Sequence, residues 1–99
     1  MRLPVTVRPL AEQDLVEARN WYEQRRQGLG WEFLVEIDAA FHLISEQAVS
    51  YPLVYQQLRR AVVRRFPYLI YFRADTDRVV VVACLHSKRN PLIARTRLP

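Results

Sequence analysis

The sequence is poor in cysteine and in glycine. Its single cysteine, Cys84, has no partner for an internal disulfide, which is typical of a protein in a reducing cytosol. Only two glycines occur, Gly28 and Gly30, so no glycine-rich loop is present to cradle a phosphate. Hydrophobic residues make up 51% of the 99 residues, which predicts one packed domain over residues 1–99.

Long hydrophobic runs are also absent. The longest, from Val79 to Leu85, is far shorter than the roughly 20 residues that a membrane-spanning helix needs. Residues Met1 to Pro4 do not resemble the start of a signal peptide. The sequence also lacks the Cys and His spacing of a zinc site. We therefore expect a cytoplasmic protein with no membrane contact, no metal and no cofactor.

Acidic residues are missing from the end of the chain, because no Asp or Glu follows Asp77. Residues 1–58 hold five Arg and eight acids, a balance of −3. Residues 59–99 hold nine Arg, one Lys and two acids, a balance of +8. This asymmetry favours an anionic partner for the C-terminal part, either a nucleic acid or an acidic protein segment. A basic surface that serves only solubility is the alternative.

Two amphipathic helices are predicted by apolar residues at steps of three and four. The first stripe consists of Ala11, Leu15, Ala18 and Tyr22, and the second of Leu34, Ile37, Phe41, Ile44 and Ala48. The first helix starts at Leu10 and is broken by Gly28 and Gly30. The second ends at Ser50-Tyr51-Pro52, because proline disfavours a helical conformation in the residue before it. The short connection predicts an antiparallel helical hairpin.

Strands are predicted at both ends of this hairpin. A short strand covers residues 4–8, and three β-rich runs follow the helices: Arg59–Phe66, Tyr68–Ala74 and Arg78–His86. The uninterrupted apolar run inside the last strand predicts a central strand covered on both faces. Asp75 and Asp77 are interpreted as turn formers, and Asn90-Pro91 as the start of a short helical tail. The fold class is α+β, ordered β-α-α-β-β-β, with the helical hairpin packed on a small, mainly antiparallel sheet.

The order of these elements and two segments resemble one known family. The segments are Arg65–Phe72, with the sequence RFPYLIYF, and Leu85–Pro91, with the sequence LHSKRNP. Both are similar to the ParE/RelE toxin superfamily. Residues 18–23, with the sequence ARNWYE, and the following Gly28-Leu29-Gly30 are similar to its ParE branch of plasmid stabilisation toxins. The resemblance covers nearly the whole chain and implies the toxin of a type II toxin–antitoxin system.

ParE-like toxins inhibit DNA gyrase and are neutralised by a cognate antitoxin. The resemblance therefore implies DNA gyrase as the target and a ParD-like antitoxin with an acidic disordered segment as the partner, in a hetero-oligomer. For target binding we expect Lys88, Arg89, Arg95 and Arg97. For antitoxin binding we expect Trp21, Tyr22, Trp31, Arg60, Arg64, Arg65 and Arg73. Strand alternation predicts Arg60 and Arg64 on one face and Arg59 and Arg65 on the other.

RelE-like members of the superfamily cleave messenger RNA on the ribosome, which is the alternative function. The resemblance implies Arg65, His86, Lys88 and Arg89 as the residues of such a nuclease. Two groups that this chemistry uses are missing. The first is an arginine directly after the strand tyrosine, because Leu69 occupies that position here, after Tyr68.

The second missing group is the C-terminal tyrosine of these nucleases, because no Tyr follows Tyr71 and Arg95 lies near the expected position. Each such group commonly contributes about 10²-fold or more to the rate of cleavage. We therefore assign no catalytic residue from the sequence. A third hypothesis is a degenerate, non-toxic module that only binds an acidic partner.

Overall fold

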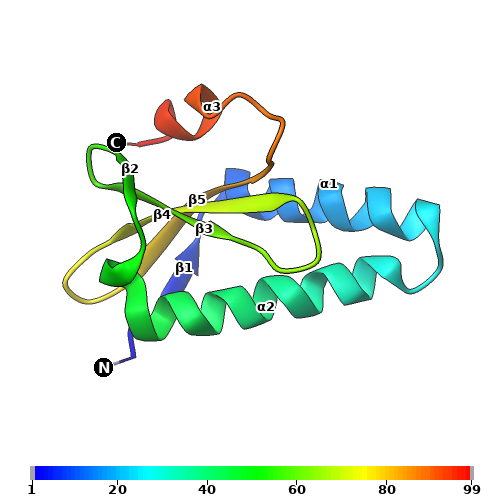
Figure 1. The fold of residues 1–99 in the computed structure, drawn as a ribbon, viewed down its shortest axis with the longest axis horizontal. Helices are drawn as coiled ribbons and strands as arrows, with labels where there is room; N and C mark the ends of the chain where they lie inside the picture. Colours follow the sequence, from blue (N-terminus) through cyan, green and yellow to red (C-terminus); the bar gives the residue numbers. More distant parts are fainter. Residues whose placement is uncertain (1, 99) are drawn as a thin grey trace.

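A helical hairpin covers one face of a five-stranded sheet, and a short helix lies on the other face (Figure 1). The computed structural model describes residues 2–98. The elements in chain order are β1 (Val5–Val7), α1 (Pro9–Arg25), α2 (Leu29–Gln47), the 3₁₀ turn η1 (Ala48–Ser50), β2 (Leu53–Tyr55), β3 (Leu58–Val62), β4 (Tyr68–Ala74), β5 (Val79–His86) and α3 (Leu92–Arg95). The predicted α+β class and the helical hairpin are confirmed. None of the described helices is both long and apolar enough to cross a membrane.

The sheet has the strand order β1-β5-β4-β3-β2. β1 runs parallel to β5, and the other neighbouring pairs are antiparallel. Residues Val79 to Leu85 of β5 are all buried, which confirms the prediction of a central strand covered on both faces. The face under the hairpin is called the helix-side face below, and the opposite one the far face.

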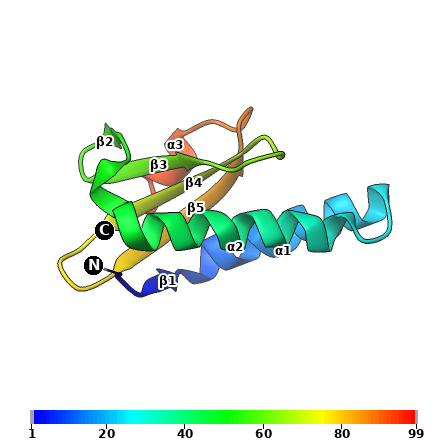
Figure 2. The same ribbon diagram turned by 60° about the horizontal axis from the view of Figure 1, so that its bottom comes forward.

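The hairpin forms because each helix buries one apolar stripe. α1 begins with Pro9, whose fixed φ suits the first helical position, and buries Ala11, Ala18 and Tyr22. α2 buries Phe33, Ile37 and Ile44. Figure 2 shows the two helices lying side by side along the sheet. The predicted second helix extended to Ser50, whereas α2 ends at Gln47 and the last three residues tighten into η1.

Glu23 closes the hairpin by capping α2. Its carboxylate accepts hydrogen bonds from the backbone N–H of Gly28, at 2.9 Å, and of Gly30, at 3.0 Å. These two bonds lower the pKa of Glu23, because they stabilise the ionised form. Gly28 has φ +87°, a conformation that other residues rarely adopt. Gly30 permits close contact between the helices, since a Cβ there would lie 2.8 Å from the carbonyl oxygen of Arg19.

Two apolar clusters hold the layers together. The larger lies between the hairpin and the helix-side face and contains Phe33, Ile70 and Phe72. The smaller lies on the far face under α3. A bulge in β5 interrupts the alternation of its side chains between the two faces of the sheet. Tyr71 pairs with Ala83 and Phe72 with Val81, so Val82 has no partner in β4. Val82 and Ala83 therefore both pack in the far-face cluster.

The prediction of a strand over Arg59–Phe66 was wrong at its end. β3 stops at Val62, so Arg64 and Arg65 lie in the turn before β4 rather than on opposite faces of a strand. Arg65 has φ +70°, which breaks the extended conformation, and its guanidinium is held by Glu32 of α2 at 2.8 Å. The three-residue edge strand β2 was not predicted, because its pairing with β3 is short and irregular.

An ion pair completes the sheet where β1 ends. Arg8 N–H donates to the carbonyl of Val81, and the chain then enters α1. The carboxylate of Asp14 accepts from the N–H of Cys84 at 3.0 Å, and the guanidinium of Arg97 donates to the carbonyl of Val82 at 3.0 Å. The two side chains also pair with each other at 2.6 Å. This arrangement, called the Asp14–Arg97 brace below, supplies the hydrogen bonds that a neighbouring strand would otherwise supply.

The close contact at Gly30 yields a stability prediction. Gly30→Ala should lower the free energy of unfolding by about 1–3 kcal/mol, because the new methyl group collides with the backbone of α1. The matched control is Gln27→Ala in the same hairpin connection, where the side chain is exposed and the change should stay within about 0.5 kcal/mol. Urea unfolding measures both variants. Equal stability of the two proteins would contradict the close packing of the helices.

Candidate functional site

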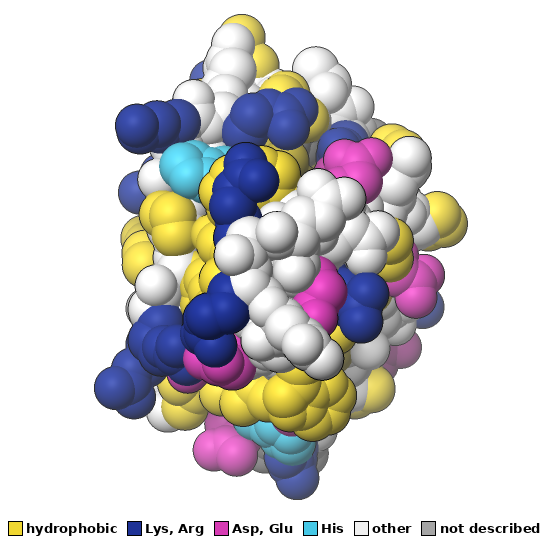
Figure 3. Space-filling model, turned by 90° about the vertical axis from the view of Figure 1, so that its right-hand side faces the viewer, with side chains coloured by type: hydrophobic (Ala, Val, Ile, Leu, Met, Phe, Trp, Pro, Cys, Tyr) yellow, Lys and Arg dark blue, Asp and Glu magenta, His cyan; other side chains and the backbone are white. Residues whose placement is uncertain are grey.

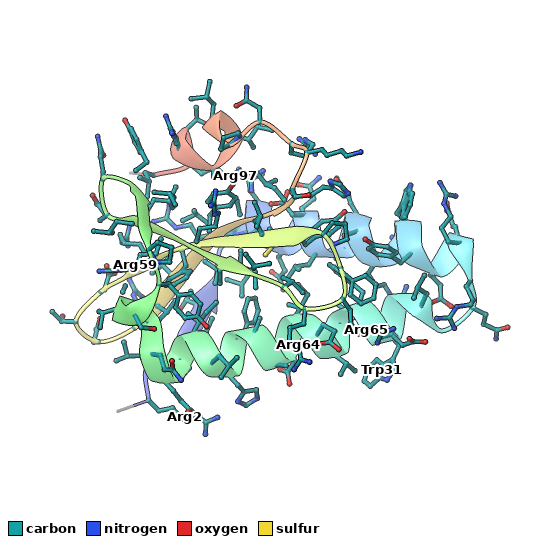
Figure 4. The ribbon with its side chains drawn as sticks, in the orientation of Figure 1. Arg2, Trp31, Arg59, Arg64, Arg65 and Arg97 are labelled. Atoms are coloured by element: carbon teal, nitrogen blue, oxygen red, sulfur yellow. The ribbon has the colours of Figure 1, made fainter. Side chains whose placement is uncertain are left out.

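The cations of the C-terminal part do not form one surface. Among the ten after position 58, three are paired with carboxylates: Arg65 with Glu32, Arg73 with Asp75 and Arg97 with Asp14. Arg59 instead donates to the carbonyls of Val49 and Tyr51. Figure 4 shows Arg59, Arg65 and Arg97 on different parts of the molecule. These four side chains stabilise the fold rather than offering free charge.

The pairings are also seen in the pKa values of the acidic partners. A hydrogen bond from Arg73 lowers the pKa of Asp75, and hydrogen bonds from Arg65 and Arg26 lower that of Glu32. Both carboxylates therefore stay ionised and hold their arginines at neutral pH. Within residues 2–98, six cations after position 58 form no ion pair and, unlike Arg59, no side-chain hydrogen bond to a backbone carbonyl: Arg60, Arg64, Arg78, Lys88, Arg89 and Arg95.

Three of these free cations lie at one end of the sheet. The loop after β5 meets the β3–β4 turn there, since Ser87 N–H donates to the carbonyl of Pro67 at 2.8 Å. Arg64 in the turn and Lys88 and Arg89 in the loop are exposed. Figure 3 looks onto this end, where Lys and Arg side chains lie beside hydrophobic ones in the upper and left parts of the view. Lys88 and Arg89 of the loop after β5 are called the end cluster. Arg64 lies on the α2 side of the same end, beside Arg65 (Figure 4).

A cavity of about 460 Å³ opens beside the end cluster, between α1 and the sheet. It is called the aromatic pocket, and its lining includes Trp21, Tyr22, Tyr68, His86, Arg89, Asp14 and Glu17. The rings of Tyr68 and His86 are 5.4 Å apart. Burial raises the pKa of Tyr68, so its hydroxyl remains a hydrogen-bond donor at neutral pH. His86 Nδ1 accepts from Lys88 N–H at 3.0 Å, which leaves Nε2 to carry the proton of the neutral ring.

The three aromatic residues expected to bind the antitoxin do not lie in one cluster. Tyr22 is only 9% exposed and packs against Phe33 and Phe66, with ring centroids at 5.3 and 4.8 Å. Trp21 is half exposed, with the guanidinium of Arg25 at 4.1 Å from its ring. Trp31 is 69% exposed on α2 and forms no aromatic pair within residues 2–98. Tyr22 is therefore primarily a core residue, whereas both tryptophans are accessible.

A second, smaller cavity lies on the far face. It measures about 270 Å³ and is lined by Val54, Leu58, Arg60, Tyr71, Pro91 and Arg95. It is called the arginine pocket. Arg60 comes from β3 and Arg95 from α3, where the Arg95 guanidinium lies 4.7 Å from the ring of Tyr55. Sequence reasoning assigned Arg60 and Arg95 to different partners and did not place them together, because no local signal shows where α3 packs.

The residues expected for a nuclease are only partly brought together. His86 and Arg89 line the aromatic pocket, but Lys88 does not, and Arg65 is held by Glu32 and Glu36. The position of Tyr68 in this pocket, beside His86, was not predicted from the sequence. The part of the chain that the structure describes holds no group of three His, Cys, Asp or Glu side chains suited to a metal ion.

The fold defines a small basic α+β protein, and comparison with known proteins gives its family. A model of the ParE toxin of type II toxin–antitoxin systems, parDE, matches residues 5–91. The chain therefore belongs to the ParE toxin family. A chain from a structure of the chromosomal ParDE toxin–antitoxin system from P. aeruginosa has a similar fold, with a TM-score of 0.76 at 13% identity. The alignment covers 86% of this chain and 96% of that one. No curated protein sequence matches.

The different burial of the aromatic residues can be tested by stability. Tyr22→Leu should lower the free energy of unfolding by about 2–4 kcal/mol, because it removes ring contacts in the core. Trp31→Ala should change it by less than about 0.5 kcal/mol, since the side chain is mostly exposed. Urea unfolding compares the two variants with the original protein. A larger loss for Trp31→Ala than for Tyr22→Leu would contradict this description.

Proposed function

We propose that this protein is a toxin that inhibits DNA gyrase and that a cognate antitoxin neutralises it. The observation that carries the proposal is the end cluster, in which Lys88 and Arg89 are exposed without an ion-pair partner in the described chain, beside an aromatic pocket. Gyrase works on DNA, whose phosphates attract exposed cations. Family membership supports the same target.

Two of the four residues expected to bind the target are placed elsewhere by the fold. Arg97 is engaged in the Asp14–Arg97 brace, and its side chain is 16% exposed. Arg95 lies in the arginine pocket on the far face. We therefore assign target binding to Lys88 and Arg89.

The antitoxin in this proposal is a ParD-like protein with an acidic disordered segment. Such a segment folds on the toxin, and its carboxylates match the free arginines of a chain that has no acid after Asp77. Trp21 and Trp31 offer accessible aromatic anchors on the hairpin. Arg65 and Arg73 already have carboxylate partners, which leaves Arg60 and Arg64 as the stronger candidates. The two proteins would form a hetero-oligomer in the cytoplasm.

One observation favours ribosome-dependent RNA cleavage as a second candidate. The aromatic pocket brings the Tyr68 phenol, His86 and Arg89 together, which are groups able to transfer a proton and to stabilise a phosphate. The contrary observations are the engagement of Arg65 by Glu32 and the absence of a tyrosine after Tyr71. Primer extension on transcripts in a translating extract tests this candidate, and intact transcripts would exclude it.

Purified gyrase tests the main proposal directly. The protein should block supercoiling of relaxed plasmid, and Lys88→Ala with Arg89→Ala should raise the half-inhibitory concentration about tenfold or more, because two cations of the contact are lost. The matched control is Arg78→Ala, which removes an exposed, unpaired cation at the opposite end of the sheet and should leave inhibition unchanged.

Two results would contradict the proposal. Normal supercoiling at saturating toxin would exclude gyrase as the target. Equal loss of inhibition in the Arg78→Ala variant would show that total charge matters rather than the end cluster.

A further inference from the structure

The arginine pocket gathers positive charge without an internal counter-charge. On the far face four arginines lie within or beside the apolar cluster. Two of them, Arg73 and Arg97, are neutralised by Asp75 and Asp14. The other two, Arg60 and Arg95, line the same cavity and pair with no carboxylate of residues 2–98. The free charge of this face is therefore concentrated at one place.

The Arg95 guanidinium is held in position before any ligand binds, and Arg60 reaches the same pocket from a fixed position on β3. Arg60 lies directly opposite Tyr71 in the antiparallel β3–β4 pair, and the Tyr71 side chain is 2% exposed. Arg95 extends from α3, and its guanidinium stacks on the ring of Tyr55 at 4.7 Å. α3 is itself packed on the far face through Ala94, which is fully buried. A ligand therefore meets a pocket in which Arg95 is already held, which lowers the entropy lost on binding.

The electrostatics of this pocket select an anion. Two like charges near a cavity with apolar walls repel each other, and an anionic group between them removes this repulsion. Val54, Leu58 and Pro91 form the apolar walls. A guanidinium pair of this kind binds a carboxylate or a phosphate through charge-assisted hydrogen bonds. The surroundings of the pocket distinguish these two anions.

An apolar row lies next to the pocket along the sheet. Val62 is two residues after Arg60, on the same face of β3, and is 72% exposed. Its cross-strand partner is Leu69, which is half buried. Arg60 and Val62 are separated by about 7 Å along β3, the distance that two residues span in a strand. A nucleic acid strand carries a phosphate at every nucleotide, so its next charge would lie against this apolar row, whereas a peptide can place an apolar side chain there.

We propose that the arginine pocket seats a Glu or Asp side chain of the antitoxin segment, and that an apolar residue two positions away in the segment covers Val62 and Leu69. This inference rests on the proposed function, because its occupant is part of the proposed antitoxin. It moves Arg95 from target binding to antitoxin binding. It also separates the two surfaces, since the end cluster contacts the target and the arginine pocket contacts the antitoxin.

A small synthetic probe tests the pocket without knowledge of the antitoxin. The probe is the blocked peptide acetyl-Glu-Ala-Leu-amide, which has an acidic and an apolar side chain two positions apart. In NMR spectra of the ¹⁵N-arginine side chains, the signals of Arg60 and Arg95 should shift saturably, and the signal of Arg78 should not. The peptide acetyl-Gln-Ala-Leu-amide should bind about tenfold more weakly or not at all, because it lacks the charge.

Substitutions on two separate elements keep the test independent of folding defects. Arg60→Gln on β3 and Arg95→Gln on α3 should each weaken peptide binding about tenfold. Arg78→Gln, outside the pocket, changes the total charge equally and should leave binding unchanged. The absence of saturable shifts would overturn the inference. Displacement of the peptide by an eight-nucleotide single-stranded DNA, with the same dependence on Arg60 and Arg95, would also overturn it in favour of a phosphate site.

The gyrase assay separates this inference from the proposed function. A protein with both Arg60→Gln and Arg95→Gln should still inhibit gyrase, because the pocket does not contact the target. Loss of inhibition in this variant, with peptide binding also lost, would overturn the division of the two surfaces. Failure of the original protein to inhibit gyrase would contradict the proposed function and leave the peptide result standing.

Discussion

The contact between Asp14 and Arg97 is the constraint on which the rest of the structure depends. It joins three parts of the chain that are distant in sequence: α1, the central strand β5 and the segment after α3. Both side chains are largely buried, at 13% and 16% exposure, and both also bond to the backbone of β5. Because the contact fixes the C-terminal segment over the far face, it also determines where α3 presents Arg95.

Internal pairing explains how a strongly basic chain can present specific binding surfaces. The balance of +8 in residues 59–99 would predict a uniformly cationic surface. Carboxylates in the fold neutralise Arg65, Arg73 and Arg97, and the carbonyls of the segment after α2 accept hydrogen bonds from Arg59. Most of the charge that remains lies in two separate places, the end cluster and the arginine pocket. Two binding functions can therefore be carried by one small domain without competing for the same cations.

Local patterns in the sequence predicted most of the fold. The apolar run from Val79 to Leu85 and the two helical stripes depend on contacts that repeat along one element, so their period is visible in a single sequence. The end of β3 depends on Arg65, which adopts a left-handed conformation and reaches Glu32 in another element, 33 residues away. The partner of Arg97 is 83 residues away. Which cations are free and which are structural is therefore decided by long-range packing, and a single sequence holds no signal for it. For the same reason, the convergence of Arg60 and Arg95 was not predicted.

A double-mutant cycle on Asp14 and Arg97 tests this account most directly. Asp14→Asn, Arg97→Met, the double variant and the original protein would be compared by urea unfolding at neutral pH. Each single variant leaves a charged or polar partner unsatisfied in a largely buried position, and the double variant removes this conflict. The account predicts a coupling energy of about 2 kcal/mol between the two positions. Effects of the single substitutions that add to within about 0.5 kcal/mol would contradict it, because independent side chains could not hold α1, β5 and the C-terminal segment together.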